Sequence, residues 1–159
     1  MKSLTKIFII FFITLFSLTL DPAKTDFQHQ RNVHWLALNI YYESGNQPML
    51  GKIAVGVVTL NRLRTRYSDS IEGVITQHKQ FSWYHPNKTY FPKDEQSWNE
   101  SVYVAKLLLN LEPNHAIIEM FDGVTHFHTT YVKPEWRKSM IKVAQIGDHI
   151  FYKTKAKKS

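Results

Sequence analysis

The chain has 159 residues, of which 43% are hydrophobic and 14% aromatic, so it is long enough for one hydrophobic core but short for two domains. It contains no cysteine, which excludes a disulfide-stapled fold, a thiol nucleophile and any zinc or iron–sulfur site built on thiolates. With 20 Lys and Arg against 13 Asp and Glu, the formal net charge is +7. This charge either steers the chain toward anionic wall polymers or lipid headgroups, or simply contributes to solubility.

The first 20 residues predict an export signal. Lys2 and Lys6 precede the uncharged run IFIIFFITLFSLTL at residues 7–20, which is shorter than the roughly 20 apolar residues that span a bilayer. A cleaved signal peptide fits this pattern, and an uncleaved N-terminal signal anchor is the alternative. In both cases the segment contacts the membrane at least transiently and the rest of the chain is exported. An exported chain rarely meets nucleic acid, so we expect no nucleic-acid partner.

Residues 27–153 predict a single domain, followed by a short basic tail at 154–159, and we expect a monomer. Apolar residues recur at three- and four-residue intervals over 33–42, which predicts the first helix. A second helix is predicted from Pro48, a residue favoured at the first helical position. Its apolar residues run to Leu60, and its far end at residues 61–66 is polar and basic.

Two further helices are predicted from capping patterns. A short helix over 71–75 has Ser68 or Asp69 as its candidate N-cap. Ser97 with Glu100 three residues later forms a capping box, which predicts that the next helix begins at this point.

The remaining segments predict loops, two short strands and one more helix. Residues 80–92 are aromatic and rich in turn formers, which favours a loop or irregular hairpin. Residues 124–129 and 149–152 are predicted strands, and residues 136–145 are a predicted helix. The predicted fold class is therefore mainly α with a small β element (α+β).

Glu43 is the most informative single residue. It lies three residues after Ile40 and seven after Leu36, so it continues the apolar stripe of the first helix, just before a stop at Gly45. A carboxyl group held on a buried face has a raised pKa, as a general acid needs near neutral pH. The alternative is a Glu that reaches solvent at a frayed helix end or pairs with an Arg of the second helix.

Four segments, in order along the chain, resemble the SleB-type cell-wall hydrolases, which include the spore cortex-lytic enzymes. They are residues 36–62 (LALNIYYESGNQPMLGKIAVGVVTLNR), 80–83 (QFSW), 125–136 (THFHTTYVKPEW) and 146–152 (IGDHIFY). The resemblance implies a lysozyme-like or resuscitation-factor-like catalytic domain. It also implies action on peptidoglycan glycan strands, between N-acetylmuramic acid and N-acetylglucosamine.

The same resemblance implies that Glu43 is catalytic, because it matches the first Glu of the family's E-A-x-G-E pattern. Residues 43–47 are Glu-Ser-Gly-Asn-Gln, so the glycine comes one place early and Gln47 replaces the usual second Glu. Gln47 can hydrogen-bond substrate but cannot act as a base. A single acid suits a lytic transglycosylase, in which Glu43 is acid and then base and the product is a 1,6-anhydromuramic end. Simple hydrolysis is the alternative.

Further substrate-binding candidates are Gln80, Ser82, Trp83, His126, His128 and Tyr131. The amide and hydroxyl groups suit sugar substituents and the rings suit sugar faces, although the aromatic residues could equally be core. His126 and His128 lie two apart on a predicted strand and so share one face.

Two other functions stay open. The His126–His128 pair with His149 or Glu135 could form a zinc site, which would indicate a wall amidase or peptidase. The departure at Gln47 also allows a catalytically impaired wall-binding module. The favoured interpretation needs no metal and no cofactor.

Overall fold

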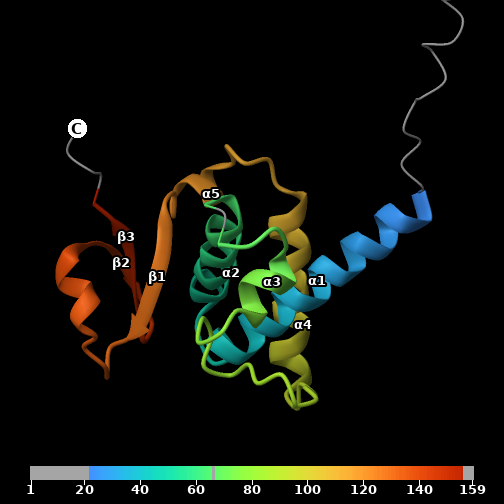
Figure 1. The fold of residues 1–159 in the computed structure, drawn as a ribbon, viewed down its shortest axis with the longest axis horizontal. Helices are drawn as coiled ribbons and strands as arrows, with labels where there is room; N and C mark the ends of the chain where they lie inside the picture. The colour runs from blue at the N-terminus through green and yellow to red at the C-terminus, as the bar shows by residue number, and fades with distance from the viewer. Residues whose placement is uncertain (1–21, 66, 156–159) are drawn as a thin grey trace, which may run out of the picture.

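The structure is a computed structural model that describes residues 22–65 and 67–155. The predicted signal segment and most of the predicted tail lie outside the described residues. The described chain forms a helical layer with a small antiparallel sheet beside it (Figure 1). The elements are α1 (Pro22–Ser44), α2 (Met49–Arg64), α3 (Ile71–Thr76), α4 (Glu95–Asn110), α5 (Ala116–Glu119), β1 (Val124–Thr129), a 3₁₀ turn η2 (Glu135–Ser139), β2 (Met140–Ile146) and β3 (His149–Thr154).

Helix α1 is longer than its apolar pattern predicts. It begins at Pro22, and its first turns project beyond the helical layer with nearly all their side chains exposed (Figure 1). Such a segment buries no stripe, so no apolar periodicity could reveal it. From Val33 onward, α1 packs on α4 and α2 and contributes Leu36 and Ile40, both fully buried, to the core. It ends at Ser44, as the glycine that follows predicts.

Helices α1, α2 and α4 approach one another closely at Gly56. A Cβ atom placed there would lie 2.4 Å from Leu108 Cδ1 and 3.2 Å from Ile40 Cδ1. A helical glycine usually destabilises a helix relative to alanine, and here the close packing explains its presence. The contact sets how closely α2 approaches the C-terminal half of α1, which contains Glu43.

The three strands have the spatial order β1-β3-β2, and both pairs are antiparallel. Strand β1 lies against α2 and connects the sheet to the helices (Figure 1). Gly147 has φ +53°, a left-handed conformation that favours glycine in the tight turn between β2 and β3. The predicted strand over 124–129 is confirmed with the same limits, and the predicted closing strand is confirmed and runs on to Thr154.

The predicted helix over 136–145 is wrong. Residues 135–139 form the 3₁₀ turn η2, and residues 140–146 form strand β2. A β-bulge between Lys142 and Ala144 breaks the alternation of side chains, so the segment shows no clean two-residue period. The segment forms a strand because its backbone hydrogen-bonds to β3. The residues of β3 follow this segment in the chain, so the local sequence of 140–146 does not reveal the pairing.

Two predicted helix caps are also corrected. Helix α3 is capped by Ser70, whose hydroxyl accepts a hydrogen bond from the Gly73 amide at 3.0 Å, and not by Ser68 or Asp69. Helix α4 begins earlier than the proposed capping box. Its cap is Asp94, whose carboxylate accepts from the Ser97 amide at 2.9 Å. The short helix α5 has no counterpart among the predicted elements, since its four residues are too few to show a period.

The C-terminal end of α2 holds the sheet against the helices. The Asn61 side-chain amide donates to the carbonyls of Phe121 at 2.8 Å and Val124 at 3.0 Å. Arg62 Nε donates to the Thr125 carbonyl at 2.8 Å. The polar end of this helix is therefore buried and carries the start of β1. Among the described helices, none combines the length and the apolar character that a membrane span needs.

Candidate active site

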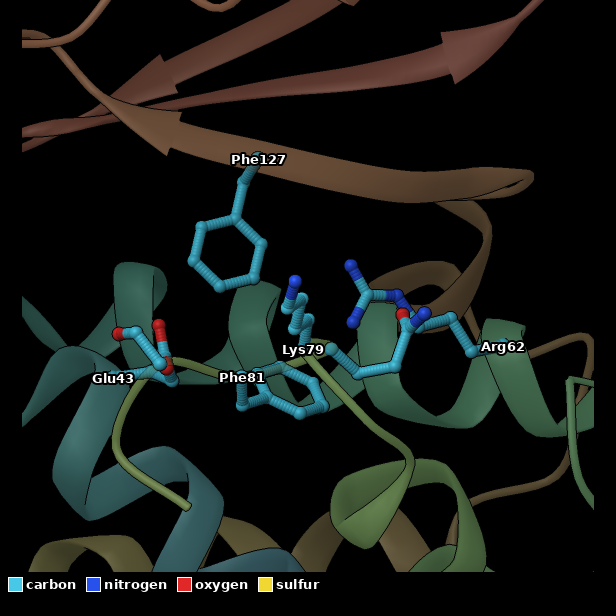
Figure 2. A pocket seen from close by; sticks show the side chains of 7 residues that line it. Glu43, Arg62, Lys79, Phe81 and Phe127 are labelled. Carbon is cyan, nitrogen blue, oxygen red and sulfur yellow. The ribbon is translucent and has the colours of Figure 1, made fainter. Parts of the chain in front are cut away.

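A cavity of about 380 Å³ lies between the end of α1, helix α2, the loop after α3 and strand β1 (Figure 2). We call it the Glu43 pocket. Its lining residues are Glu43, Arg62, Lys79, Gln80, Phe81, Ser82 and Phe127. Four separate segments of the chain meet there. Among the described residues that line the pocket, Glu43 is the one with a carboxyl group.

The Glu43 side chain is half-buried at the edge of the Glu43 pocket. It sits in the last turn of α1, and burial raises its pKa from an ordinary 4.5 to about 7, against a smaller lowering effect of the Arg62 charge. A group with this pKa is substantially protonated near neutral pH and can still release its proton. The pocket therefore holds a carboxyl group suited to donate a proton and to take one back.

Two aromatic rings enclose the space beside Glu43. Phe81 is 4% exposed and its ring lies on the helical side, while Phe127 reaches in from β1 on the opposite side (Figure 2). Aromatic rings give a pocket apolar walls that can pack against a ligand. Phe81 is nearly covered and Phe127 is half-buried, so Phe127 offers more of this surface.

Arg62 closes the far end of the pocket (Figure 2). Its side chain is 6% exposed, and its guanidinium carbon lies 4.8 Å from the centre of the Phe81 ring. Burial lowers the pKa of Arg62, while the charges of Tyr67 and Glu43 act in the opposite direction. In the sequence this end of α2 has the pattern of a polar, basic helix terminus, and no local signal marks Arg62 as buried.

The loop that carries Gln80 and Ser82 is held in place by Asn39. Like Arg62, Asn39 is not among the functional residues that the sequence predicts. Asn39 lies one helical turn before Glu43 and is fully buried. The side-chain oxygen Oδ1 of Asn39 accepts a hydrogen bond from Trp83 Nε1 at 2.9 Å, and the side-chain NH₂ group donates to Thr59 Oγ1 at 2.9 Å. The sequence does contain a signal for this role, because Asn39 is a polar residue on the apolar face of the predicted helix. A polar side chain buried at such a position needs hydrogen-bond partners.

The end of α1 is held by Lys52, a lysine that is only 2% exposed. Its ammonium group donates to the Gly45 carbonyl at 2.7 Å and forms an ion pair with Glu100 at 3.0 Å. Ser97 Oγ donates to the same Gly45 carbonyl at 2.9 Å. These contacts satisfy the helix C-terminus two residues after Glu43 and fix the direction of that side chain.

Of the predicted binding residues, Gln80 and Ser82 lie in the Glu43 pocket, as does Phe81 between them. Trp83 does not line the pocket. Its ring stacks on Tyr42 with centroids 4.8 Å apart, and its Nε1 donates the hydrogen bond to Asn39. The polar members of this segment thus face the cavity and the tryptophan anchors the loop.

His126 and His128 do not line the pocket. They share one face of β1, as their spacing predicts, and Phe127 between them points from the opposite face toward Glu43. His128 is buried, with its two ring nitrogens at 2.8 Å from the Thr129 carbonyl and 3.0 Å from the Tyr152 hydroxyl. Burial lowers the pKa of His126, and the Arg62 charge lowers it further.

Gln47 and Tyr131 meet at a different place, the turn between β2 and β3. Gln47 is 8% exposed and bonds both the amide and the carboxylate of Asp148. Tyr131 is 80% exposed, and its hydroxyl donates to the Asp148 carboxylate at 3.3 Å. Neither side chain lines the Glu43 pocket.

The zinc alternative requires three ligands directed at one point. Within residues 22–65 and 67–155, no three His, Asp or Glu side chains are grouped closely enough to hold a metal ion. His128 also has both ring nitrogens engaged by protein groups. The described donor set therefore does not fit a zinc site at the proposed residues.

The fold is similar to solved structures of SleB catalytic domains, which agrees with the predicted mainly α class. The catalytic domain of the Bacillus cereus SleB protein matches with a TM-score of 0.58 at 22% identity, over 78% of this chain and 91% of that chain. The catalytic domain of the germination-specific lytic transglycosylase SleB from Bacillus anthracis matches with the same score and identity, over 95% of that chain.

Curated relatives with the name spore cortex-lytic enzyme are similar in sequence. The protein of Oceanobacillus iheyensis is 26% identical over 136 residues, which is 78% of this chain and 42% of the relative. That of Halalkalibacterium halodurans is 27% identical over 122 residues, 76% of this chain and 34% of the relative. The chain thus spans less than half the length of these relatives.

A family model described as cell wall hydrolase matches residues 46–152, well over half of the chain. The matched segment contains every residue that lines the pocket except Glu43, which lies three positions before it. The resemblance to SleB-type proteins is confirmed, and the chain belongs to the cell wall hydrolase family.

Proposed function

We propose that this chain cleaves the glycan strand of peptidoglycan between N-acetylmuramic acid and N-acetylglucosamine, as a lytic transglycosylase with Glu43 as acid and then base. The single observation that carries the proposal is the Glu43 carboxyl group, with its pKa of about 7, in a pocket enclosed by two aromatic rings. Family membership supports the substrate class. The similarity to a protein titled a lytic transglycosylase supports the reaction type.

The reaction uses one carboxyl group twice. Protonated Glu43 gives its proton to the glycosidic oxygen as the bond from that oxygen to C1 of muramic acid breaks. The resulting Glu43 carboxylate then removes the proton from the 6-hydroxyl of the same sugar while that oxygen bonds to C1. A 1,6-anhydromuramic end forms, no water is consumed, and Glu43 regains its proton.

The alternative, hydrolysis by two carboxylates, requires a second acidic side chain at a defined separation across the bond. Among the described residues, Glu43 is the acidic side chain in the pocket lining. The other polar groups there, on Gln80 and Ser82, can hydrogen-bond hydroxyl and acetamido groups but cannot act as a carboxylate. This composition favours internal attack by the sugar's own hydroxyl group.

The proposed site of action lies outside the cytoplasmic membrane, where peptidoglycan is found. The predicted signal segment supports export, with at least transient membrane contact during passage. We propose glycan strands as the partner of a monomeric domain.

Mass spectrometry of digested peptidoglycan tests the proposal with the wild-type chain and Glu43→Gln. We expect anhydromuropeptides from the wild type and none from the variant, which keeps the shape of the side chain without its acidity. Reducing muramic ends would indicate hydrolysis instead. Products that disappear with a chelator would indicate the zinc enzyme, and wall binding without products would indicate a binding module.

A further inference from the structure

The excess positive charge of the domain lies in one part of the fold. Residues 22–132, which contain the helices and β1, have ten Lys and Arg and ten Asp and Glu, so their formal charges cancel. Residues 133–155, which contain η2, β2 and β3, have six Lys and Arg against two Asp and Glu. This separation gives the sheet side of the molecule a positive field, which attracts anionic surfaces.

Strand β2 and the turn η2 form the outer edge of the sheet. In the order β1-β3-β2, strand β1 lies against α2, so β2 is the strand farthest from that helix (Figure 1). The main contacts of β2 are with β3 and η2. A bulge between Lys142 and Ala144 breaks the alternation of side chains, and residues 141–143 are all exposed. This edge is therefore open to a partner.

Exposed apolar and cationic side chains are interleaved along this edge. We call the following six residues the η2–β2 surface: the exposed apolar Trp136, Ile141 and Val143, and the cationic Arg137, Lys138 and Lys142. Among the described residues, Lys138 is the one of these cations with an ion pair, 2.7 Å from Glu135. Both partners of that pair are exposed, so it contributes little and leaves the lysine available to a ligand.

The register of the sheet places Trp136 and Lys142 on one face. Lys142 lies opposite Tyr152, and directly opposed residues of neighbouring strands project from the same face. The Tyr152 ring packs edge-on against Trp136, with centroids 5.5 Å apart. Phe127, which points toward Glu43, projects from the opposite face of the sheet. A partner bound on the Trp136 face therefore leaves the Glu43 pocket open.

The chemistry of this surface restricts its partner. A bulge and a lysine on an edge strand hinder pairing with a further strand, so a peptide added to the sheet fits poorly. A soluble polyanion would use the cations but not the exposed aliphatic side chains. An anionic bilayer uses both, because its headgroups attract Lys and Arg while Trp and aliphatic side chains enter the boundary with the acyl chains.

We propose that the η2–β2 surface binds anionic phospholipid headgroups on the outer side of the membrane across which the chain is predicted to be exported. The predicted signal segment brings the chain to that membrane. In the bound state the Glu43 pocket lies on the face of the sheet turned away from the lipid. The proposal is independent of the proposed function, since lipid binding involves no peptidoglycan.

Hydrogen exchange with mass spectrometry on the full chain tests where the lipid binds. We expect amide exchange over residues 135–146 to slow about tenfold on vesicles of equal parts phosphatidylglycerol and phosphatidylcholine, and to stay unchanged on phosphatidylcholine alone. Helix α4 should show no change on either vesicle. Because exchange is read segment by segment, binding through the apolar run at residues 7–20 does not mimic this result.

Cosedimentation with the same vesicles tests the side chains. Lys138→Gln with Lys142→Gln should weaken binding to the anionic vesicles about fivefold for each cation removed. Lys88→Gln with Lys106→Gln is the matched control, since it removes two exposed lysines from the helical side, and binding should stay within about twofold of the wild type. Circular dichroism checks that each variant is folded.

The apolar side chains are tested by Ile141→Thr with Val143→Thr, which keeps β-branched residues in the strand. This variant should weaken binding about threefold, and the loss should persist when salt is raised from about 0.1 to about 0.5 M. Binding to long-chain polyphosphate as tight as to the vesicles, with no loss in this variant, would overturn the lipid assignment in favour of a soluble polyanion.

Two further results would overturn the surface itself. One is unchanged exchange over residues 135–146 on the anionic vesicles, and the other is equal weakening by the control pair of lysine substitutions. Failure of the chain to release anhydromuropeptides would instead overturn the proposed function and leave the lipid result unaffected.

Discussion

The side-chain amide of Gln47 is bound to Asp148 at both of its ends. Its oxygen accepts a hydrogen bond from the Asp148 backbone amide at 2.9 Å, and its nitrogen donates to the Asp148 carboxylate at 3.3 Å. The link joins the start of α2 to the turn between β2 and β3, 101 residues apart in the chain. The departure from the family pattern at Gln47 is thus part of a contact that positions the sheet.

Gln47→Glu should destabilise the protein by about 1–2 kcal/mol at pH 7 to 8. The new carboxylate can still accept from the backbone amide, but it loses the donor and faces a like charge on Asp148. Protonation of either carboxyl group removes this repulsion, so the loss should shrink as the pH falls and should be smallest at about pH 4 and below. Urea unfolding at several pH values measures the effect.

Asp148→Asn is the matching partner for this substitution, because its amide can donate to the carboxylate introduced at position 47. The double variant should recover at least half of the lost stability at neutral pH. Equal stability of Gln47→Glu and the wild type across the pH range would show that the bridge to Asp148 contributes nothing.

The rate of glycan cleavage should fall as pH rises above about 7. Glu43 must be protonated to act as the acid, and its pKa of about 7 places the loss of that proton in this range. We expect kcat/KM to decrease about tenfold per pH unit above this value. Rates followed by release of anhydromuropeptides check the profile; a rate that is flat up to about pH 9 would remove Glu43 from the role of acid.

Glu43→Gln should stabilise the fold at high pH. The folded pKa of Glu43, about 7, lies above its ordinary 4.5, so the folded state holds the proton more tightly and the wild type loses stability as pH rises from 4.5 through 7. Gln avoids this loss. The gain should be near zero below about pH 4.5 and about 1–3 kcal/mol at about pH 8, allowing for partial exposure of the carboxyl group.

Thermal unfolding across this pH range measures the gain. Glu112→Gln, which removes an exposed carboxyl group beyond the end of α4, is the matched control. A stability difference between Glu43→Gln and wild type that does not change with pH would contradict the burial of Glu43.

Asn39→Leu should cost about 1–3 kcal/mol and also reduce kcat/KM. The substitution leaves Trp83 Nε1 without its acceptor and removes the donor to Thr59. The loop that carries Gln80 and Ser82 then loses its anchor beside Glu43. A double-mutant cycle with Trp83→Phe should give a coupling energy of about 1 kcal/mol, and strict additivity would show that the Asn39–Trp83 bond is not the cause.

Local patterns in the sequence predict the parts of the fold that depend on neighbouring residues. The apolar spacing that places Glu43 on the buried side of α1, and the glycine that ends this helix, are visible without any other part of the chain. The loop over 80–92 and strand β1 are predictable for the same reason. Strand β2 is not, because its hydrogen-bond partners lie in β3 and a bulge hides its period.

The sequence by itself determined that an acidic side chain would sit on an apolar helix face, because side-chain direction in a helix follows from residue spacing alone. Only the tertiary structure decided what covers that side chain. Burial raises the Glu43 pKa, and the pocket around Glu43 is completed by Phe81 and Phe127 from distant segments. Arg62 at the end of α2 is likewise bonded to the start of β1. Charges and pKa values respond to atoms close in space, and those neighbours are fixed only when the chain is folded.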